Sequence, residues 1–357
     1  MGTKLSSRDA ALSHQLLTWY DRYRRKLPWR AELGKTVDPY RVWLSEIMLQ
    51  QTTVTTVIPY FGAFLCRWPT VKDLAKASID DVLHAWQGLG YYARAHNLHA
   101  CAKAVSEDMG GRFPDNEEAL RSLPGIGTYT AAAIAAIAFG RRCAPVDGNI
   151  ARVMARLHTL QEPLPQVRQT AGDHAFRLTP NDRPGDFVQA MMDLGATVCK
   201  PRNPACDICP WHQACQARRN GTSNAYPIAA AKRERPLRHG IVFWTERSDQ
   251  SILVRRRPEK GLLGGMAEFP STTWGPAQVT EKVACSAAPC LAQWRPLPGV
   301  VAHGFTHFRL ELTVWRGRAS DNEAPPGHRW CPVSQLGALA LPTLMRKVAQ
   351  HVEPLCL

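Results

Sequence analysis

The chain of 357 residues is 45% hydrophobic, which supports a sizeable core but is long for a single one, so we expect two domains. Its formal net charge of +14 favours a polyanionic partner, with nucleic acid ahead of an anionic membrane surface. No apolar run approaches the roughly 18 residues that span a bilayer, and the N-terminus lacks both the apolar segment of a secretion signal and a transit peptide rich in Arg and Ser. We therefore expect no membrane partner and predict a bacterial cytoplasmic protein.

The hydrophobic pattern changes once along the chain. Apolar residues first recur at helical spacing with short Gly or Pro breaks, which predicts an all-α domain over residues 1–217. Residues 218–237 are polar and basic with little periodicity, as expected of a linker. The pattern then alternates, most clearly over residues 308–314, which predicts an α/β domain that is mostly strand over residues 238–357, with a helix near residues 344–352.

Glu46 is the first candidate for chemistry. It lies in the apolar helical sequence VWLSEIML, with Gln50 one turn later on the same face. A glutamate in such surroundings is either an edge residue in solvent, which is the commoner case, or a partly desolvated acid with a raised pKa. Only the second suits a proton donor near neutral pH, and these residues alone do not decide between the two.

Two glycines, Gly125 and Gly127, stand in the segment LPGIGTYT before an alanine-rich helix that Gly140 is placed to end. Without Cβ atoms they allow a tight turn and a close approach, while the free N–H groups of the following helix point outward at an anion such as a DNA phosphodiester. A plain joint between helices is the alternative for G-x-G alone. LPGxG before such a helix resembles the hairpin of the helix-hairpin-helix DNA glycosylases.

Asp147 lies in the short polar turn VDGN, ahead of another helical segment. As an isolated residue it is most simply a helix N-cap. Its place after the hairpin matches the catalytic Asp of the same superfamily, and the two roles can coexist.

Four of the 11 cysteines fall within one short run at the spacing C-x6-C-x2-C-x5-C, namely Cys199, Cys206, Cys209 and Cys215. The total is odd, which argues against a complete disulfide set, and in a reducing compartment the run predicts a metal site. Zinc is one alternative, although structural zinc sites usually offer two close pairs and this run has one CxxC between single cysteines.

Six features in the same order resemble the adenine DNA glycosylase (MutY) family. They are WLSEIMLQQT, WQGLGYYARAHNLH, LPGIGTYTAAAI, VDGNIARVMAR, QAMMDLGATVC and the cysteine spacing. The resemblance implies a [4Fe-4S] cluster on the four cysteines. It also implies that the cluster holds the basic loop 200–203 against the DNA backbone, with Arg202 as a phosphate contact.

The implied reaction removes adenine mispaired with 8-oxoguanine, or with guanine, from double-stranded DNA in base excision repair. The implied enzyme is a monomer that acts on the bacterial nucleoid. The adenine must be extruded from the duplex. Gln50, Leu89 and Tyr91 match positions that fill or wedge the stack, with helix-end packing as the alternative, and Arg30 and Gln189 match positions that line the adenine pocket.

The resemblance assigns separate chemical roles to two carboxyl groups. Glu46 would protonate adenine N7, and Asp147 would stabilise the oxocarbenium-like sugar or capture C1′ covalently before water completes hydrolysis. Asn149 and Tyr129 would orient the acid, the Asp and the nearby phosphate. Bifunctional relatives such as endonuclease III carry a nucleophilic lysine where this chain has Tyr129, so the resemblance implies a glycosylase without efficient strand cleavage.

The C-terminal half resembles, more loosely, the family's Nudix-like lesion-recognition domain. LVRRRP at residues 253–258 and GLLGGMAEFP at residues 261–270 match its first strand and loop. The R-E-x-x-E-E metal helix of an active Nudix hydrolase is absent, so nucleotide hydrolysis is not expected. Phe305, Thr306 and His307 align with a Phe-Ser-His loop in which a hydroxyl and an imidazole would read the 8-oxoguanine edge. Without the alignment, His307 is most simply a strand-end histidine.

Two rival functions remain from the sequence. An endonuclease III-like pyrimidine glycosylase and lyase is disfavoured by Tyr129 and by the additional C-terminal domain. A non-catalytic DNA-binding or damage-sensing module is disfavoured by the intact Glu46 and Asp147.

Overall fold

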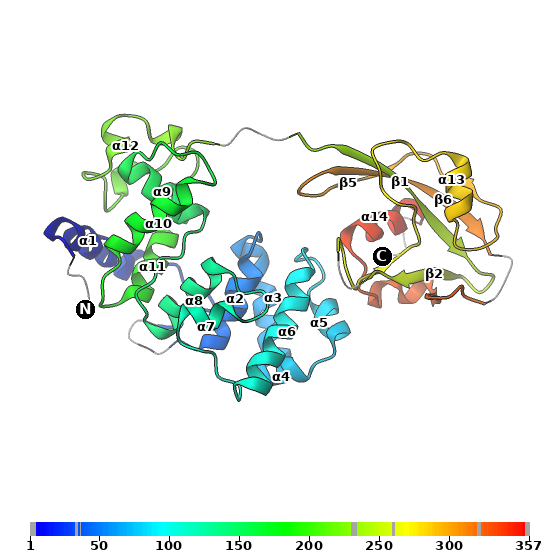
Figure 1. Ribbon diagram of the computed structural model, residues 1–357, viewed down its shortest axis with the longest axis horizontal. Coiled ribbons are helices and arrows are strands. Elements are labelled where there is room, and N and C mark those ends of the chain that lie inside the picture. The colour runs from blue at the N-terminus through cyan, green and yellow to red at the C-terminus, as the bar shows by residue number, and fades with distance from the viewer. Residues whose placement is uncertain are drawn as a thin grey trace. The chain divides into compact units, whose positions relative to one another are not determined.

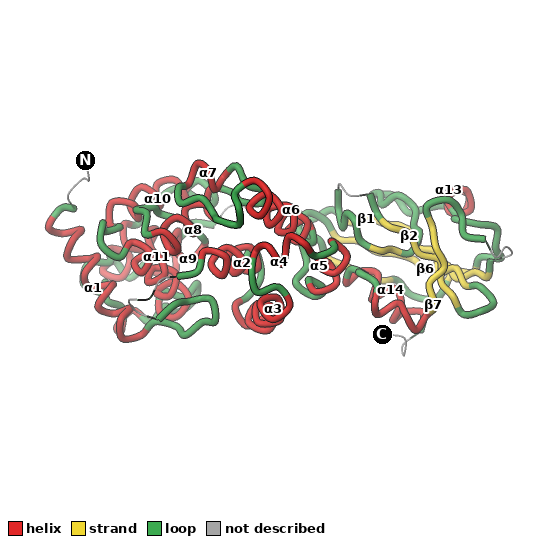
Figure 2. The backbone as a smooth tube through the Cα atoms, turned by 90° about the horizontal axis from the view of Figure 1, so that it is seen from below, coloured by secondary structure: helices red, strands yellow, loops and turns green. Residues whose placement is uncertain are grey.

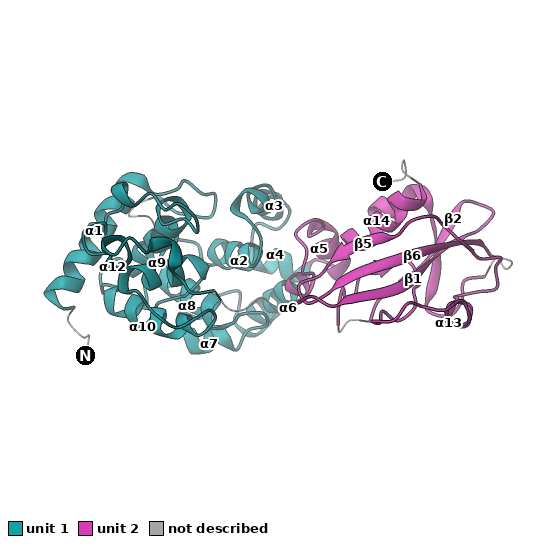
Figure 3. Ribbon diagram, turned by 90° about the horizontal axis from the view of Figure 1, so that it is seen from above, with its two compact units in different colours: residues 1–76, 97–231 teal, residues 77–96, 232–357 magenta. Residues whose placement is uncertain are grey.

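The computed structural model describes residues 5–32, 35, 37–229, 234–258, 261–319 and 323–353. The chain forms two compact units, shown separately in Figure 3: unit 1 comprises residues 1–76 and 97–231, and unit 2 comprises residues 77–96 and 232–357. The predicted boundaries at residues 217 and 238 stay a prediction, and the segment 77–96 belongs to the same compact unit as the C-terminal strands.

The elements of unit 1 are helices and short helical turns, as predicted (Figure 2). Its α-helices are α1 (Ser7–Tyr23), α2 (Pro39–Leu49), α3 (Val54–Arg67), α4 (Val71–Lys76), most of α6 (Ala93–Asp108), α7 (Glu117–Arg121), α8 (Thr128–Phe139), α9 (Gly148–His158), α10 (Val167–Leu178), α11 (Pro184–Asp193) and α12 (Gln216–Arg219). Shorter turns are η1 (Leu194–Val198), η2 (Cys206–Ile208) and η3 (Ser223–Ala225).

Local sequence determines where these helices start and end. Several begin at a side chain that accepts a hydrogen bond from a first-turn N–H, namely Ser6, Asp38, Thr53 and Asp147. Helix α8 instead follows Gly127, which offers no side-chain cap. It ends as predicted at Gly140, whose φ of 63° lies in the left-handed region that glycine enters at little cost.

One hydrophobic core of unit 1 joins α1, α9, α10 and α11 to the cysteine segment. Leu16, Met154 and Phe187 are fully buried in it. Trp211, which lies between the third and fourth clustered cysteines, is 2% exposed. Its indole N–H donates to the carbonyl of Leu12 at 2.9 Å. The cysteine segment is therefore anchored on α1 by both packing and a buried hydrogen bond.

Unit 2 combines a seven-stranded mixed sheet with helices (Figure 1). Its strands are β1 (Leu237–Glu246), β2 (Ser251–Arg256), β3 (Ala267–Glu268), β4 (Arg295–Pro296), β5 (Val301–Gly304), β6 (Arg309–Arg318) and β7 (His328–Pro332). Its helical elements are α5 (Ile79–Ala85), α13 (Glu281–Ala287), η4 (Val333–Ala338) and α14 (Thr343–Val352).

The sheet order is β3-β2-β1-β6-β4, with β5 paired to β6 and β7 paired to β2. Strands β1 and β6 are parallel, and the other pairs are antiparallel. Helix α14, predicted near residues 344–352, buries Leu344, Met345 and Val348 against the sheet in one hydrophobic core. The predicted α/β fold of the C-terminal part is thus confirmed.

Candidate active site and cysteine cluster

Glu46 is buried on helix α2, where its side chain is 7% exposed. Burial is the main cause that raises its pKa from 4.5 to about 7. A hydrogen bond from Tyr129 lowers this pKa, the nearby charge of Asp147 raises it, and the charge of Arg30 lowers it. Of the two environments that the sequence left open, Glu46 therefore occupies the desolvated one.

Glu46 lines a small cavity within unit 1 that also contains Arg30 and Gln189. The other lining residues are mostly apolar and come from the α1–α2 loop, α2, α3, α8 and α11, namely Arg25, Leu27, Trp29, Val42, Ser45, Leu49, Val54, Ile137 and Met192. The side-chain amide of Gln189 donates to the carbonyl of Gly185 at 3.2 Å. An apolar cavity with a few converging polar groups is the usual form of a small-ligand site.

Arg30 is held by Asp193, a residue that the sequence analysis did not single out. Its two terminal nitrogens contact the two carboxylate oxygens of Asp193 at 2.6 and 2.8 Å. Arg25 adds its Nε at 2.5 Å and its backbone N–H at 3.0 Å. Burial opposes the ionisation of Asp193, but the hydrogen bonds and charge of Arg30, with the charge of Arg25, hold its pKa below the usual value. The signal in the sequence was an acid directly after the mostly apolar segment FVQAMM.

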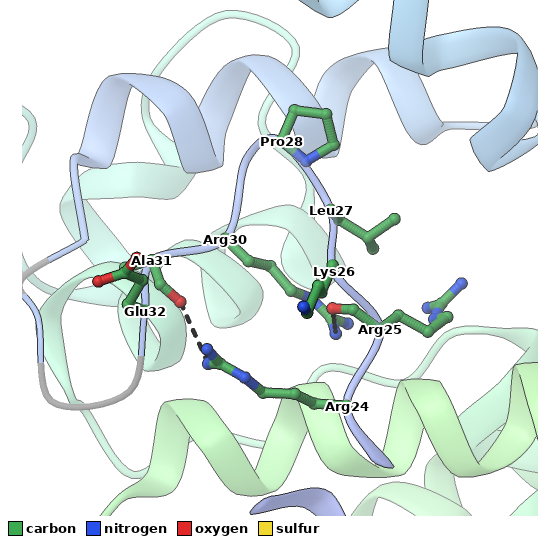
Figure 4. A pocket seen from close by; sticks show the side chains of 8 residues that line it. All are labelled: Arg24, Arg25, Lys26, Leu27, Pro28, Arg30, Ala31 and Glu32. Atoms are coloured by element: carbon green, nitrogen blue, oxygen red, sulfur yellow. Dashed lines mark hydrogen bonds between the residues drawn. The ribbon is translucent and has the colours of Figure 1, made fainter. Parts of the chain in front are cut away.

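A more open cavity of about 640 Å³ shares Arg25, Leu27 and Arg30 with the Glu46 cavity (Figure 4). It is formed by the loop between α1 and α2, and Arg24 and Lys26 also line it. The guanidinium of Arg24 donates to the carbonyl of Ala31 at 3.2 Å and so braces this loop. Four basic side chains and one acid, Glu32, line this open cavity, and the excess of positive charge favours an anionic ligand there.

Asp147 is the N-cap of α9, as its local sequence predicted. One carboxylate oxygen accepts from the N–H of Ile150 at 2.7 Å, and the other accepts from the side-chain amide of Asn149 at 2.8 Å. Arg152 donates to the amide oxygen of Asn149 at 2.8 Å and to the carbonyl of Cys199 at 2.8 Å. A chain of hydrogen bonds through Asn149 and Arg152 therefore connects the predicted catalytic Asp to the cysteine segment.

Tyr129 lies at the start of α8, close enough to Glu46 and Asp147 to interact with both acids. Burial raises the pKa of its phenol well above the ordinary value, and the negative charges of Glu46 and Asp147 raise it further. The hydroxyl consequently stays protonated and can act as a hydrogen-bond donor to Glu46.

The four clustered cysteines line one cavity together with Arg156 and His212. Burial, with a smaller contribution from the charges of its three cysteine neighbours, raises the pKa of the Cys209 thiol to about 12. Four converging thiols that oppose one another's ionisation fit an iron-sulfur cluster, whose irons would stabilise all four thiolates. Among the described residues, no three His, Cys, Asp or Glu side chains are close enough to share a single metal ion.

Arg156 was not predicted, yet it organises the cysteine loop. It is 2% exposed and donates to Cys199 Sγ at 3.3 Å, to the carbonyl of Lys200 at 2.6 Å and to the carbonyl of Pro201 at 2.9 Å. The neighbouring Arg202, the predicted phosphate contact, is exposed. The loop backbone is thus fixed from inside while its basic side chain faces outward.

The glycines of the hairpin have separate roles. Gly125 has φ 75°, and a Cβ atom there would lie 2.6 Å from Cβ of Asn97, so both the backbone and the packing require glycine. A Cβ on Gly127 would meet nothing within 4 Å. The start of α8 is therefore open to a close ligand, as expected for a phosphate contact.

The predicted stack-filling residues have different environments. Gln50 caps the end of α2 in unit 1, and its amide donates to the hydroxyl of Thr130 at 3.2 Å. Leu89 is 5% exposed, whereas Tyr91 is 49% exposed with φ 47° in the left-handed region. A left-handed aromatic residue on the surface is strained, and such strain concentrates at functional sites.

The predicted lesion-recognition loop joins β5 to β6 within unit 2. Phe305 is half-buried and lies 4.7 Å from Phe308 between ring centroids, while Thr306 and His307 are exposed. The hydroxyls of Tyr91 and Thr306 lie 3.0 Å apart in a hydrogen bond. One predicted wedge residue and one predicted lesion reader are therefore in direct contact.

Comparison with known proteins identifies the family. The chain matches the HhH-GPD superfamily of base excision DNA repair proteins over residues 44–173, the iron-sulfur binding domain of endonuclease III over residues 199–215 and the NUDIX domain over residues 241–351. It is 36% identical to the adenine DNA glycosylase of Homo sapiens, over 95% of this chain and 73% of the relative. The chain belongs to the adenine DNA glycosylase family. The relative from Rattus norvegicus is 35% identical, over 96% of this chain and 78% of its own.

Membership of the adenine DNA glycosylase family confirms several predictions. The chain is a DNA-binding repair enzyme that hydrolyses N-glycosyl bonds, and the predicted [4Fe-4S] cofactor is confirmed by the iron-sulfur match. Among solved structures, a thermostable thymine-DNA glycosylase covers 60% of this chain and 97% of its own at a TM-score of 0.54 and 31% identity. Among the described residues, no helix is long and apolar enough to cross a membrane.

Proposed function

We propose that this adenine DNA glycosylase excises adenine opposite 8-oxoguanine, and also opposite guanine, and does not cleave the DNA strand. The observation that carries the proposal is the state of Glu46, a buried acid with a pKa of about 7 in a cavity shared with Arg30 and Gln189. At pH 7 about half of such an acid holds its proton, compared with about one molecule in 300 at a pKa of 4.5. Burial thus supplies a proton donor at neutral pH.

Proton transfer from Glu46 to adenine N7 weakens the glycosidic bond, because the bonding electrons can then leave with a neutral base. The C1′–N9 bond breaks and the sugar becomes an oxocarbenium-like cation. Arg30 is held by its paired contact with Asp193, and Gln189 by Gly185, so both can bind the flipped base without reorganisation.

Asp147 supplies the anion that the sugar cation requires. Its two hydrogen bonds, from Ile150 and Asn149, fix the orientation of the carboxylate before the reaction. Its charge also raises the pKa of Glu46, so the two acids lie close enough to interact. This pairing of a protonated acid with an ionised one is the arrangement of two-carboxyl glycosidases.

The absence of strand cleavage follows from Tyr129. A lyase of this superfamily attacks C1′ with an amine and continues through a Schiff base. Here the corresponding group is a phenol that burial and two neighbouring acids keep protonated. It donates to Glu46 and offers no amine.

DNA recognition would use surfaces from both units. Gly125, Gly127 and Arg202 would contact backbone phosphates, which the open space at Gly127 and the exposure of Arg202 support. Tyr91 and Thr306, joined by their hydrogen bond, would wedge the stack and read the lesion together.

The remaining assignments follow the family resemblance. Gln50 and Leu89 fill the space left by the flipped base, and Phe305 and His307 complete the reading loop. Cys199, Cys206, Cys209 and Cys215 hold the iron-sulfur cluster, which when bound fixes the loop that carries Arg202. The enzyme acts as a monomer on the nucleoid in the bacterial cytoplasm.

The test uses a duplex with one labelled adenine opposite 8-oxoguanine, in enzyme excess, with half of each sample treated with alkali. Strand breakage only after alkali supports the proposal. Breakage without alkali would favour the lyase, and no breakage in either half would favour a binding module. Glu46→Gln and Asp147→Asn should each abolish base release and leave DNA binding nearly unchanged. Comparable activity in the Asp147→Asn enzyme would overturn the mechanism.

A further inference from the structure

Unit 2 contains a cavity to which no role has been assigned. Its volume is about 340 Å³. It is lined by the end of β2, the start of β7, the segment after η4 and one residue of α5, namely Asp80, Val254, Arg255, Arg256, Gly265, Ala267, Gly327, His328, Arg329, Ala338, Leu339 and Ala340. None of these residues belongs to the predicted recognition loop or to the Glu46 cavity.

The charge of this cavity is strongly positive. Three arginines line it, Arg255, Arg256 and Arg329, against one acid, Asp80. Behind them the buried carboxylate of Glu268 contacts Arg255 at 2.8 Å and also pairs with Arg257, so one acid serves two arginines. The local excess of guanidinium over carboxylate is the feature that recognises phosphate.

The acid at the edge of the cavity forms a weak, replaceable contact. Asp80 lies 3.2 Å from Arg256, and the two side chains are 73% and 45% exposed. An ion pair this exposed contributes little to stability, so a phosphate oxygen can take the place of the Asp80 carboxylate. Arg329 is exposed and has no ion pair among the residues that the structure describes.

His328 adds a polar group at the cavity wall. Its Nδ1 lies 3.0 Å from the carbonyl of Pro326, which can only accept, so Nδ1 carries a proton. Its Nε2 is buried and has no partner among the described residues. A buried ring nitrogen without a partner is costly unless something completes its hydrogen bonding.

We propose that this cavity binds a phosphate ester through Arg329, Arg256 and Arg255, with Asp80 as an internal competitor. The strand register shows at which end of the sheet the cavity lies, relative to the predicted recognition loop. The predicted recognition loop comes directly before Arg309, which pairs with the start of β1. Strand β2 runs antiparallel to β1, so Arg255 and Arg256 at the end of β2 lie toward the same end of the sheet as that loop. The phosphate belongs either to the DNA backbone or to a free nucleotide. This proposal does not depend on the proposed excision chemistry.

The test relies on two surface variants with opposite expected effects. Arg329→Gln removes a cation and should weaken phosphate binding about tenfold or more, as expected for a charge-assisted contact. Asp80→Asn removes the competitor and should strengthen it severalfold. Arg318→Gln, an exposed arginine on β6 that pairs with the far end of β1, is the matched control and should change nothing. Thermal melting of each holoenzyme verifies that the variants fold.

Two arms distinguish the phosphate sources. Calorimetric titration with inorganic pyrophosphate and with dGMP tests the free ligand, and a duplex titration at several salt concentrations tests the backbone. Opposite shifts of the two variants with dGMP or pyrophosphate would assign a nucleotide. Opposite shifts with the duplex alone, with the salt slope reduced by about one in Arg329→Gln, would assign the DNA backbone. Any other pattern, including unchanged affinities, a shift in one variant only, or shifts in the same direction, would overturn the proposal.

Discussion

Replacing Tyr129 by Phe should raise the pH at which the enzyme loses activity. In the proposed mechanism Glu46 must be protonated to act, and its pKa of about 7 predicts that excision is fastest below pH 7 and falls tenfold per pH unit well above it. The hydrogen bond from Tyr129 stabilises the ionised carboxylate and therefore lowers this pKa. Removing the hydroxyl removes that stabilisation, so the pKa of Glu46 should rise.

The expected shift follows from the energy of one hydrogen bond to a charged group. Such a bond contributes roughly 1.5 kcal/mol or more, and about 1.4 kcal/mol corresponds to one pKa unit. The midpoint of the profile in Tyr129→Phe should therefore lie about one pH unit higher than in the wild type. The maximal rate should fall as well, because the acid is held less firmly.

The assay is the single-turnover rate of adenine release, with enzyme saturating over the DNA, between pH 5.5 and pH 9. Tyr40→Phe is the control, since Tyr40 on α2 is also a buried phenol, and its hydroxyl donates to the carbonyl of Trp68 at 2.9 Å, away from Glu46. Its midpoint should match that of the wild type. A midpoint in Tyr129→Phe that is unchanged or lower would refute the role of this hydrogen bond in setting the acidity of Glu46.

Three further predictions concern stability and DNA binding. Asp193→Asn leaves the guanidiniums of Arg30 and Arg25 without their buried partner, so it should lower the free energy of unfolding in urea by about 3–5 kcal/mol and weaken excision. A urea midpoint equal to that of the wild type would contradict this prediction. Burial lowers the pKa of His158 from 6.5 to about 4, so the unfolded chain takes up the proton first. Stability should then fall by up to roughly 3 kcal/mol between pH 6.5 and pH 4, and His158→Gln should flatten this dependence. Gly125→Ala should lower the melting temperature because its Cβ would lie 2.6 Å from Cβ of Asn97, whereas Gly127→Ala, which meets no neighbour, should melt like the wild type although both should weaken duplex binding; equal melting temperatures would disprove that distinction.

Local features of the chain were predictable because they depend on neighbouring residues. The N-cap at Asp147 and the left-handed end of α8 at Gly140 follow from residue type and position. The environment of Glu46 was not predictable from its own segment, since its desolvation depends on residues from the α1–α2 loop, α8 and α11 that fold over it. The same holds for the pair of Arg30 and Asp193, which are 163 residues apart in the chain.

Helix α9 connects the cysteine segment to Asp147, one of the two carboxyls of the proposed mechanism. Its N-cap is Asp147, while Arg152 and Arg156 on later turns are buried and need acceptors. The carbonyls of Cys199, Lys200 and Pro201 supply them. A guanidinium buried without acceptors would be strongly destabilising, so the fixed cysteine loop is a structural requirement of the helix that begins at Asp147. In the proposed mechanism the loop therefore acts by positioning Asp147, without any part in bond breaking.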